Sequence, residues 1–140
     1  MIWFRTTSPI FRGFGVEWTP TVIIADSSGA ERYRFDGYLP VEEFLPLLEF
    51  GLGKAAFARS NWKEAERWFR SVVEQYPQSD IAPEALYWAG VANYKETEDA
   101  RALTETASAL QARYPASIWA KKASVWAAPQ ESEKNLQAAD

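Results

Sequence analysis

The sequence of 140 residues contains no cysteine and no histidine. Without cysteine the chain cannot form a disulfide or offer a nucleophilic thiol, and without histidine it lacks the general base of Ser-His and Cys-His relays. The usual nitrogen and sulfur ligands of zinc are missing as well. We therefore expect no thiol chemistry within this chain, no metal site and no cofactor.

Clustered positive charge and long apolar runs are also scarce. The formal net charge is −4, and Lys121–Lys122 is the only adjacent basic pair, whereas nucleic-acid backbones are bound by clustered Lys and Arg. No run approaches the 18 or more apolar residues of a membrane span, and residues 1–5 are too few for the apolar core of a signal peptide. We expect no nucleic-acid partner, no membrane partner and a cytoplasmic location.

The first fifty residues change from a strand pattern to a helical one. Residues 8–15 predict a short helix, with Ser8 as N-cap and Pro9 at the first helical position. The apolar, β-branched run at 21–26 predicts a strand buried on both faces. A Ser-Ser-Gly turn then leads to residues 31–39, where charged and aromatic residues alternate, so the two segments predict a hairpin.

From residue 41 onward the apolar residues recur with a helical period, and the sequence repeats itself. Residues 76–89 match residues 114–127 at an offset of 38, with Tyr, Pro, Ser, two Ala, Trp and a final Ala identical. Upstream, residues 53–57 match 90–94 at an offset of 37. A repeat of this length made only of helices predicts helix pairs stacked as a solenoid.

The repeated unit resembles the tetratricopeptide repeat. That family's order of Leu-Gly, a small residue, an aromatic residue and a proline is met by Leu52, Gly53, Ala65, Phe69 and Pro77. The second unit keeps Gly90, Ala102 and Pro115 but has Thr106 or Ala107 at the aromatic position, so it is a weaker match. A third unit is expected to begin at Lys121 and to be cut off by Pro129, leaving one capping helix.

Residues 8–50 resemble the C-terminal half of a thioredoxin-like domain. The resemblance lies in FGVEWTPTVIIADSSGAERYRFDGYLPVEEFLPLL, which contains a Thr-Pro-Thr segment, an apolar strand, a turn, a second strand and a last helix. It implies a cis Pro20 and a Thr19 backbone that docks a substrate strand. The family's Cys-x-x-Cys half is missing, and Asp26 corresponds to a turn residue, not to the buried proton-relay aspartate.

Together these patterns predict an α+β fold that is mostly α-helical. It consists of a truncated thioredoxin-like β-hairpin and helix, followed by a solenoid of tetratricopeptide-like α-hairpins. We assign residues 1–50 to the partial thioredoxin-like segment, 51–128 to about two and a half repeats, and 129–140 to a flexible polar tail.

Aromatic side chains are abundant, with seven Trp, six Tyr and eight Phe, and this surface has to pack internally or against a partner. The tetratricopeptide register implies a concave, peptide-binding face with aromatic anchors and two ammonium groups suited to an acidic peptide. Its residues are Phe50, Lys54, Phe57, Tyr87, Val91, Tyr94 and Lys95. In the alternative, Phe50, Phe57 and Tyr94 pack against the hairpin or a neighbouring helix. Three tryptophans, Trp68, Trp88 and Trp126, are expected between helices in the core.

The acidic pairs Glu42–Glu43, Glu64–Glu66 and Glu96–Glu98 have no second catalytic group beside them, so we expect no enzyme. The first interpretation is a non-catalytic protein–protein interaction module that binds a partner or client polypeptide. The alternative is the C-terminal part of a thiol-disulfide oxidoreductase or redox-linked chaperone whose Cys-x-x-Cys half is missing.

The apolar strand raises a separate question, because such a strand normally has a neighbour on each side. We expect residues 2–5 to add a strand there, or two chains to pair at that edge as a homodimer.

Overall fold

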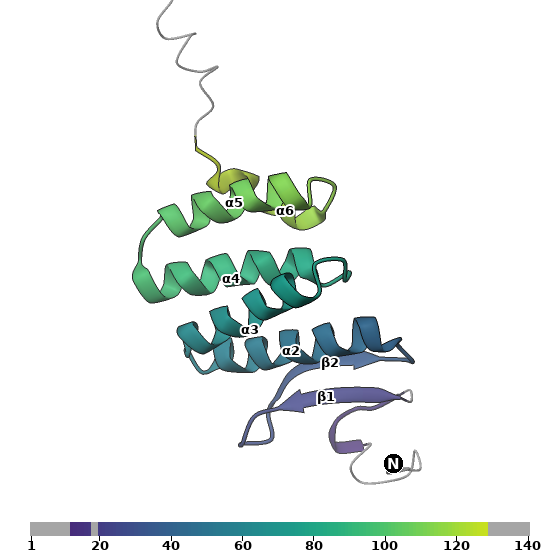
Figure 1. The fold of residues 1–140 in the computed structure, drawn as a ribbon. Helices are drawn as coiled ribbons and strands as arrows, with labels where there is room; N and C mark the ends of the chain where they lie inside the picture. Colours follow the sequence, from purple (N-terminus) through teal and green to yellow (C-terminus); the bar gives the residue numbers. More distant parts are fainter. Residues whose placement is uncertain (1–11, 18–19, 129–140) are drawn as a thin grey trace, which may run out of the picture.

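The computed structural model describes residues 12–17 and 20–128, and its elements follow one another along a single stack (Figure 1). They are β1 (Thr21–Ala25), β2 (Glu31–Asp36), α2 (Val41–Ala58), α3 (Trp62–Gln75), α4 (Ala82–Thr97), α5 (Arg101–Arg113), α6 (Ile118–Ala123) and the 3-10 helix η1 (Ser124–Trp126). A small sheet at one end is followed by helices, which confirms the predicted α+β, mostly α-helical class.

The hairpin is antiparallel, with Val22 opposite Phe35 and Ile24 opposite Tyr33. Its turn is organised by Asp26, whose carboxylate accepts hydrogen bonds from the backbone N–H groups of Ser28 and Ala30 at 2.9 and 3.1 Å. The Ser28 hydroxyl and the Arg32 guanidinium also donate to it and hold the pKa of Asp26 well below its usual range. Asp26 is the turn residue that the sequence predicts.

The prediction that β1 is buried on both faces is wrong. Its first four side chains are only partly buried and Ala25 is exposed; among the described residues, α2 is the long helix that packs on the hairpin. On the other face Arg34 reaches the short segment 12–17, where its Nη2 donates to the carbonyl oxygen of Phe14 at 2.5 Å.

Helix α2 packs against the hairpin and against α3, and two glycines make both contacts close. An ideal Cβ at Gly51 would lie 2.0 Å from Cδ1 of Ile24, and one at Gly53 would lie 2.5 Å from Cε1 of Phe69. The helix also runs without a break through Pro46, which is buried. It continues across residue 50, so the predicted boundary between residues 50 and 51 lies inside a continuous helix.

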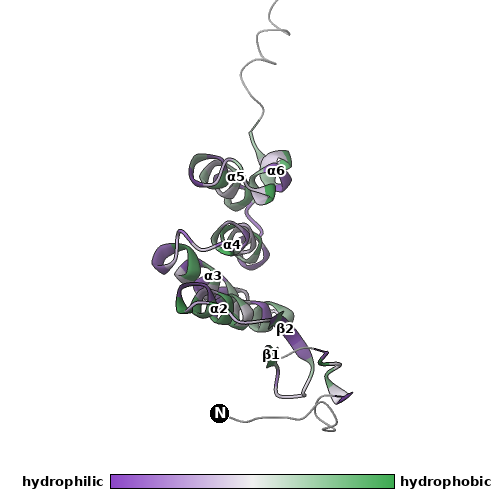
Figure 2. Ribbon diagram, turned by 90° about the vertical axis from the view of Figure 1, so that its right-hand side faces the viewer, coloured by the Kyte–Doolittle hydropathy of each residue, from purple (hydrophilic) through white to green (hydrophobic). Residues whose placement is uncertain are grey.

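The helices form the predicted stack of pairs, α2 with α3 and α4 with α5, while α6 and η1 begin a third unit (Figure 2). In the second pair, Thr106 lies against Gly90 as Phe69 lies against Gly53 in the first. Thr106 is therefore the residue that replaces the family's aromatic, and its hydroxyl donates to the carbonyl oxygen of Ala102 at 2.7 Å. A small polar side chain thus allows the two helices to approach.

The ends of the stack differ from the sequence-based expectation in one respect. The third unit begins at Ile118 and not at Lys121, because the Ser117 hydroxyl caps α6 by accepting a hydrogen bond from the N–H of Ala120 at 3.1 Å.

At the other end, residues 12 and 13 are helical, but Ser8 and Pro9 lie outside the described residues, as does the tail at 129–140. No helix in the described part of the chain is long and apolar enough to cross a membrane.

Candidate partner-binding surface

Six aromatic side chains from successive units form a continuous series of ring contacts, which we call the aromatic row. Its members are Phe57, Trp62, Tyr87, Trp88, Trp119 and Trp126. Phe57 lies between Trp62 and Trp88, with ring centroids 4.9 and 5.4 Å apart. Tyr87 continues the row from Trp88 at 5.6 Å. All six side chains are only partly buried.

Tyr87 connects the second unit to the third. Its ring is stacked on Trp126 of η1, with centroids 4.7 Å apart and planes inclined by 26°, and it contacts Trp119 of α6 at 4.9 Å. Apart from Trp62, which begins α3, the row comes from α2, α4 and α6–η1, the first helix of each unit. The row therefore follows the direction in which the units stack.

Three lysines place their ammonium groups over tryptophans of the row. Lys54 Nζ lies 4.2 Å from the ring centroid of Trp88, Lys122 Nζ lies 4.1 Å from that of Trp119, and Lys95 Nζ lies 6.0 Å from that of Trp62. Such cation–π contacts are electrostatically favourable. Within the described ranges none of the three lysines forms a salt bridge. Their positive charge is therefore not neutralised by an ion pair there.

One carboxylate lies among these cations. Glu84 Oε1 accepts a hydrogen bond from Nε1 of Trp88 at 3.3 Å, and its pKa is raised because burial disfavours the ionised form, against the opposing influence of Trp88, Lys54 and Lys122. Burial also lowers the pKa of Lys54. Both groups are therefore incompletely hydrated, and low hydration strengthens the interaction of a charged group with an incoming charge.

The structure brings together Lys54, Phe57 and Tyr87 of the predicted binding residues, and it places Lys95 at the edge of the same row. Tyr94 is 37% exposed and makes no ring contact with another described aromatic residue. Pro20 is exposed immediately before β1, where its carbonyl oxygen accepts a hydrogen bond from the N–H of Gly37 at 2.7 Å. Pro20 is thus on the hairpin and not in the row.

The remaining two positions are Phe50 and Thr19. The sequence left two alternatives for Phe50, the groove or packing against the hairpin, and the structure shows the second: Phe50 is 1% exposed, with its ring centroid 5.2 Å from that of Tyr33 and 5.3 Å from that of Phe69. Its position in the middle of α2 directs it to the core between the hairpin and α3, as the alternative proposed. Thr19 lies outside the described residues, so the implied cis bond before Pro20 does too.

Sequence reasoning missed several members of the row. Trp88 and Trp126 were assigned to the core, and they do pack against it while remaining partly exposed; Trp68 is partly buried and lies outside the core cluster. The sequence did contain an indication of the row: Trp88 and Trp126 are equivalent across the 38-residue offset, so they recur on one side of the stack. No such indication exists in the sequence for three other residues. Trp62 lies outside the matched segments, and Trp119 and Lys122 differ from their counterparts at the 38-residue offset. Their place on this surface depends on how the helices pack.

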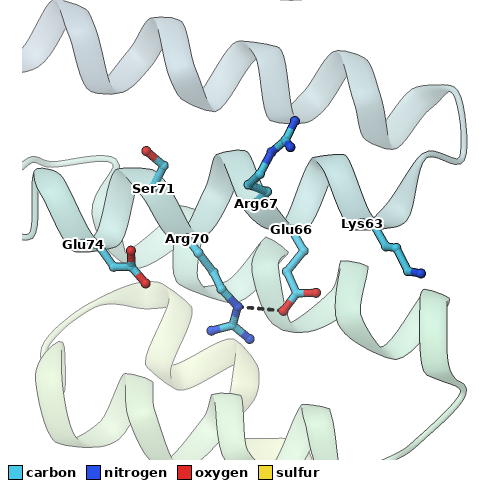
Figure 3. A pocket seen from close by; sticks show the side chains of 6 residues that line it. All are labelled: Lys63, Glu66, Arg67, Arg70, Ser71 and Glu74. Carbon is cyan, nitrogen blue, oxygen red and sulfur yellow. Dashed lines mark hydrogen bonds and ion pairs between the residues drawn. The ribbon is translucent and has the colours of Figure 1, made fainter.

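A second surface feature lies on α3. Six side chains surround an open hollow of about 430 Å³: Lys63, Glu66, Arg67, Arg70, Ser71 and Glu74 (Figure 3). Arg70 pairs with Glu66 at 2.6 Å, and Lys63 pairs with Glu96 at 3.4 Å. Much of the charge around the hollow is thus already neutralised, and no described residue has a buried polar side-chain atom without a partner.

Comparison with protein families identifies both parts of the chain. Residues 5–52 match the model of a thioredoxin-like domain, and residues 48–79 and 84–117 match the model of the tetratricopeptide repeat. The chain carries a thioredoxin-like segment followed by tetratricopeptide repeats. No curated protein matches the sequence at a significant level.

The two family matches overlap within α2. Residues 48–52 belong to both, so the last helix of the thioredoxin-like segment is also the first helix of the first tetratricopeptide repeat. Tetratricopeptide repeats generally mediate protein–protein interactions, and most of the aromatic row lies inside the two matched repeats. The matches and the geometry together indicate an interaction module.

Proposed function

We propose that this chain is a non-catalytic protein–protein interaction module that binds a partner or client polypeptide along the aromatic row. The observation that carries the proposal is the row itself: partly exposed rings from three successive units lie in contact, with three ammonium groups over them. Large rings that are already ordered offer contact area at a low entropic cost, as in the centres of protein interfaces.

The charges favour an acidic partner. The row carries three lysines and one glutamate, while the whole chain has a net charge of −4, so the row is a local positive region on an acidic protein. Carboxylates of a partner can pair with Lys54 and Lys122, and its apolar side chains can pack against the rings between them. We propose an extended or helical acidic peptide segment as the ligand, with no nucleic-acid or membrane partner and the expected cytoplasmic location.

The absence of a catalytic role is part of the proposal and rests first on the lack of cysteine and histidine. The acidic pairs also have structural partners: Glu64 accepts from Asn61 at 2.7 Å, and Glu66 accepts from Asn93 at 2.9 Å besides pairing with Arg70. The family matches do not favour the alternative that the chain is the C-terminal part of a thiol oxidoreductase or redox-linked chaperone.

Binding can be tested with three short fluorescent peptides that share the same leucines and tyrosines but carry only Glu, only Gln or only Lys at their polar positions. We expect the Glu peptide to bind most tightly, with an affinity that falls as salt is added. Lys54→Met and Lys122→Met remove a charge but keep the apolar stem, and each should weaken the Glu peptide about three- to tenfold and leave the Gln peptide unchanged.

Lys121→Met is the matched control, because Lys121 is exposed next to Lys122 and makes no cation–π contact with a described ring. Trp119→Ala should weaken both the Glu and the Gln peptide, with folding checked by circular dichroism. Equal binding of all three peptides, or equal effects of Lys121→Met and Lys122→Met, would remove the aromatic row as the binding surface.

A further inference from the structure

The charges along the aromatic row alternate in sign from one unit to the next. Lys54 lies on α2, Glu84 on α4 and Lys122 on α6. Helix α4 contacts both α2 and α6, whereas in the described part of the chain α2 and α6 do not contact each other (Figure 1). The first helices of the three units therefore present a positive, a negative and a positive group in that order along the stack.

Glu84 retains capacity for a further polar contact. It is only partly buried, and its Oε1 accepts a hydrogen bond from Nε1 of Trp88 at 3.3 Å. Among the described residues it forms no salt bridge, although a carboxylate offers about four acceptor positions. Most of these positions are therefore left for solvent or for a ligand.

The two lysines do not take up this capacity. Both act on Glu84 electrostatically, but the ammonium group of each lies over a tryptophan ring of the row. Burial has the largest influence on the pKa of Glu84 and raises it despite both lysines. A cation at hydrogen-bonding distance from the carboxylate favours the ionised form and so offsets the effect of burial.

On the basis of the proposed function, we propose that the polypeptide bound by the aromatic row carries one basic residue between two acidic residues, and that Glu84 pairs with the basic one. The outer carboxylates of the ligand pair with Lys54 and Lys122, which offsets the repulsion between these lysines and the ligand's cation. An acidic residue at the central position meets Glu84 instead and is disfavoured. Glu84 thus determines specificity by repelling one class of ligand as well as by attracting another.

Three fluorescent peptides test this order of charges. The first is the Glu peptide described above, the second has Lys in place of its central Glu, and the third has Lys in place of a Glu at one end. We expect the centre-Lys peptide to bind about three- to tenfold more tightly than either of the other two. Because the centre-Lys and end-Lys peptides have the same composition and net charge, a difference between them reports the position of the cation.

Glu84→Gln gives the matching test on the protein. Glutamine keeps an acceptor for Trp88 but has no charge, so the preference for the centre-Lys peptide should disappear. Asp80→Asn, which removes a carboxylate from an exposed loop position, should leave the preference unchanged. Circular dichroism reports whether each variant folds.

The outcomes separate this order of charges from the function on which it rests. Equal binding of the centre-Lys and end-Lys peptides, or a preference that survives in Glu84→Gln, would overturn the order of charges. The proposed function would still stand if the Glu peptide bound more tightly than the Gln peptide. Failure of all the peptides to bind would overturn both.

Discussion

The ring of Phe69 occupies the space that a side chain at Gly53 would need. Its Cε1 and Cδ1 atoms lie 2.5 and 2.7 Å from the ideal Cβ position, and Phe69 is completely buried. The ring therefore cannot move into solvent to make room. This contact determines how closely α2 and α3, the two helices of the first repeat, approach each other.

Gly53→Ala should accordingly destabilise the protein although alanine is the better helix former. Relief of glycine's helix penalty contributes about 1 kcal/mol in favour, while overpacking a filled core costs about 1–3 kcal/mol. We expect a net loss of up to about 2 kcal/mol in the free energy of unfolding, measured by urea denaturation. An unchanged or increased stability would show that α3 shifts without cost.

The equivalent contact in the second repeat permits a rescue experiment. An ideal Cβ at Gly90 would lie 2.1 Å from Oγ1 of Thr106 and 2.6 Å from its Cγ2, so Gly90→Ala should also destabilise by up to about 2 kcal/mol after the gain in helix propensity. Thr106→Ala removes both atoms. In the double variant most of the loss should disappear, a coupling that a double-mutant cycle measures; strictly additive effects would contradict the proposed contact.

A hydrogen bond joins the ends of the two repeats. Tyr114 Oη donates to the carbonyl oxygen of Pro77 at 2.8 Å, so Tyr114→Phe should cost about 0.5–1.5 kcal/mol in the free energy of unfolding. Tyr76 is its equivalent in the first repeat, and its hydroxyl bonds to no described residue. Tyr76→Phe is therefore the matched control and should lower the free energy of unfolding much less. Equal losses in the two variants would mean that the hydrogen bond from Tyr114 to Pro77 does not contribute to stability.

The pH dependence of stability should reveal Glu84. Its pKa is raised in the folded protein from the ordinary 4.5, chiefly because burial disfavours the charge. The protonated form therefore favours folding, and this contribution is present below the unfolded pKa and lost as the pH rises through the folded one. Glu84→Gln should remove that decline and make the protein relatively more stable at pH 7, measured by thermal unfolding from pH 4 to 7.

The same substitution bears on binding. Removing the carboxylate of Glu84, on which Lys54 and Lys122 act, should increase the affinity for the all-Glu peptide and leave the all-Gln peptide nearly unchanged. Asp80→Asn, at an exposed loop position, controls for the change in net charge. If both variants raised the affinity equally, the effect would be one of overall charge and not of the aromatic row.

Local features of the chain were predictable from sequence because they depend on neighbouring residues. The Asp26 turn follows from hydrogen bonds within five residues, and the helix pairs follow from a repeat whose apolar positions recur. The burial of β1 was mispredicted, and that of Phe50 was left between two alternatives, because burial depends on which element lies opposite. For Phe50 that element is the hairpin, more than a dozen residues upstream, together with α3.

The sequence by itself determined the kinds of element, their order and the presence of tetratricopeptide repeats after a thioredoxin-like segment, since these are recorded in composition and period. Only the tertiary structure decided that one helix serves both parts and that Tyr87 stacks on Trp126 while Lys54 lies over Trp88. Each of these contacts joins residues on different elements or units. Their geometry depends on how closely the helices pack, and that spacing is set by small residues such as Gly53 and Gly90.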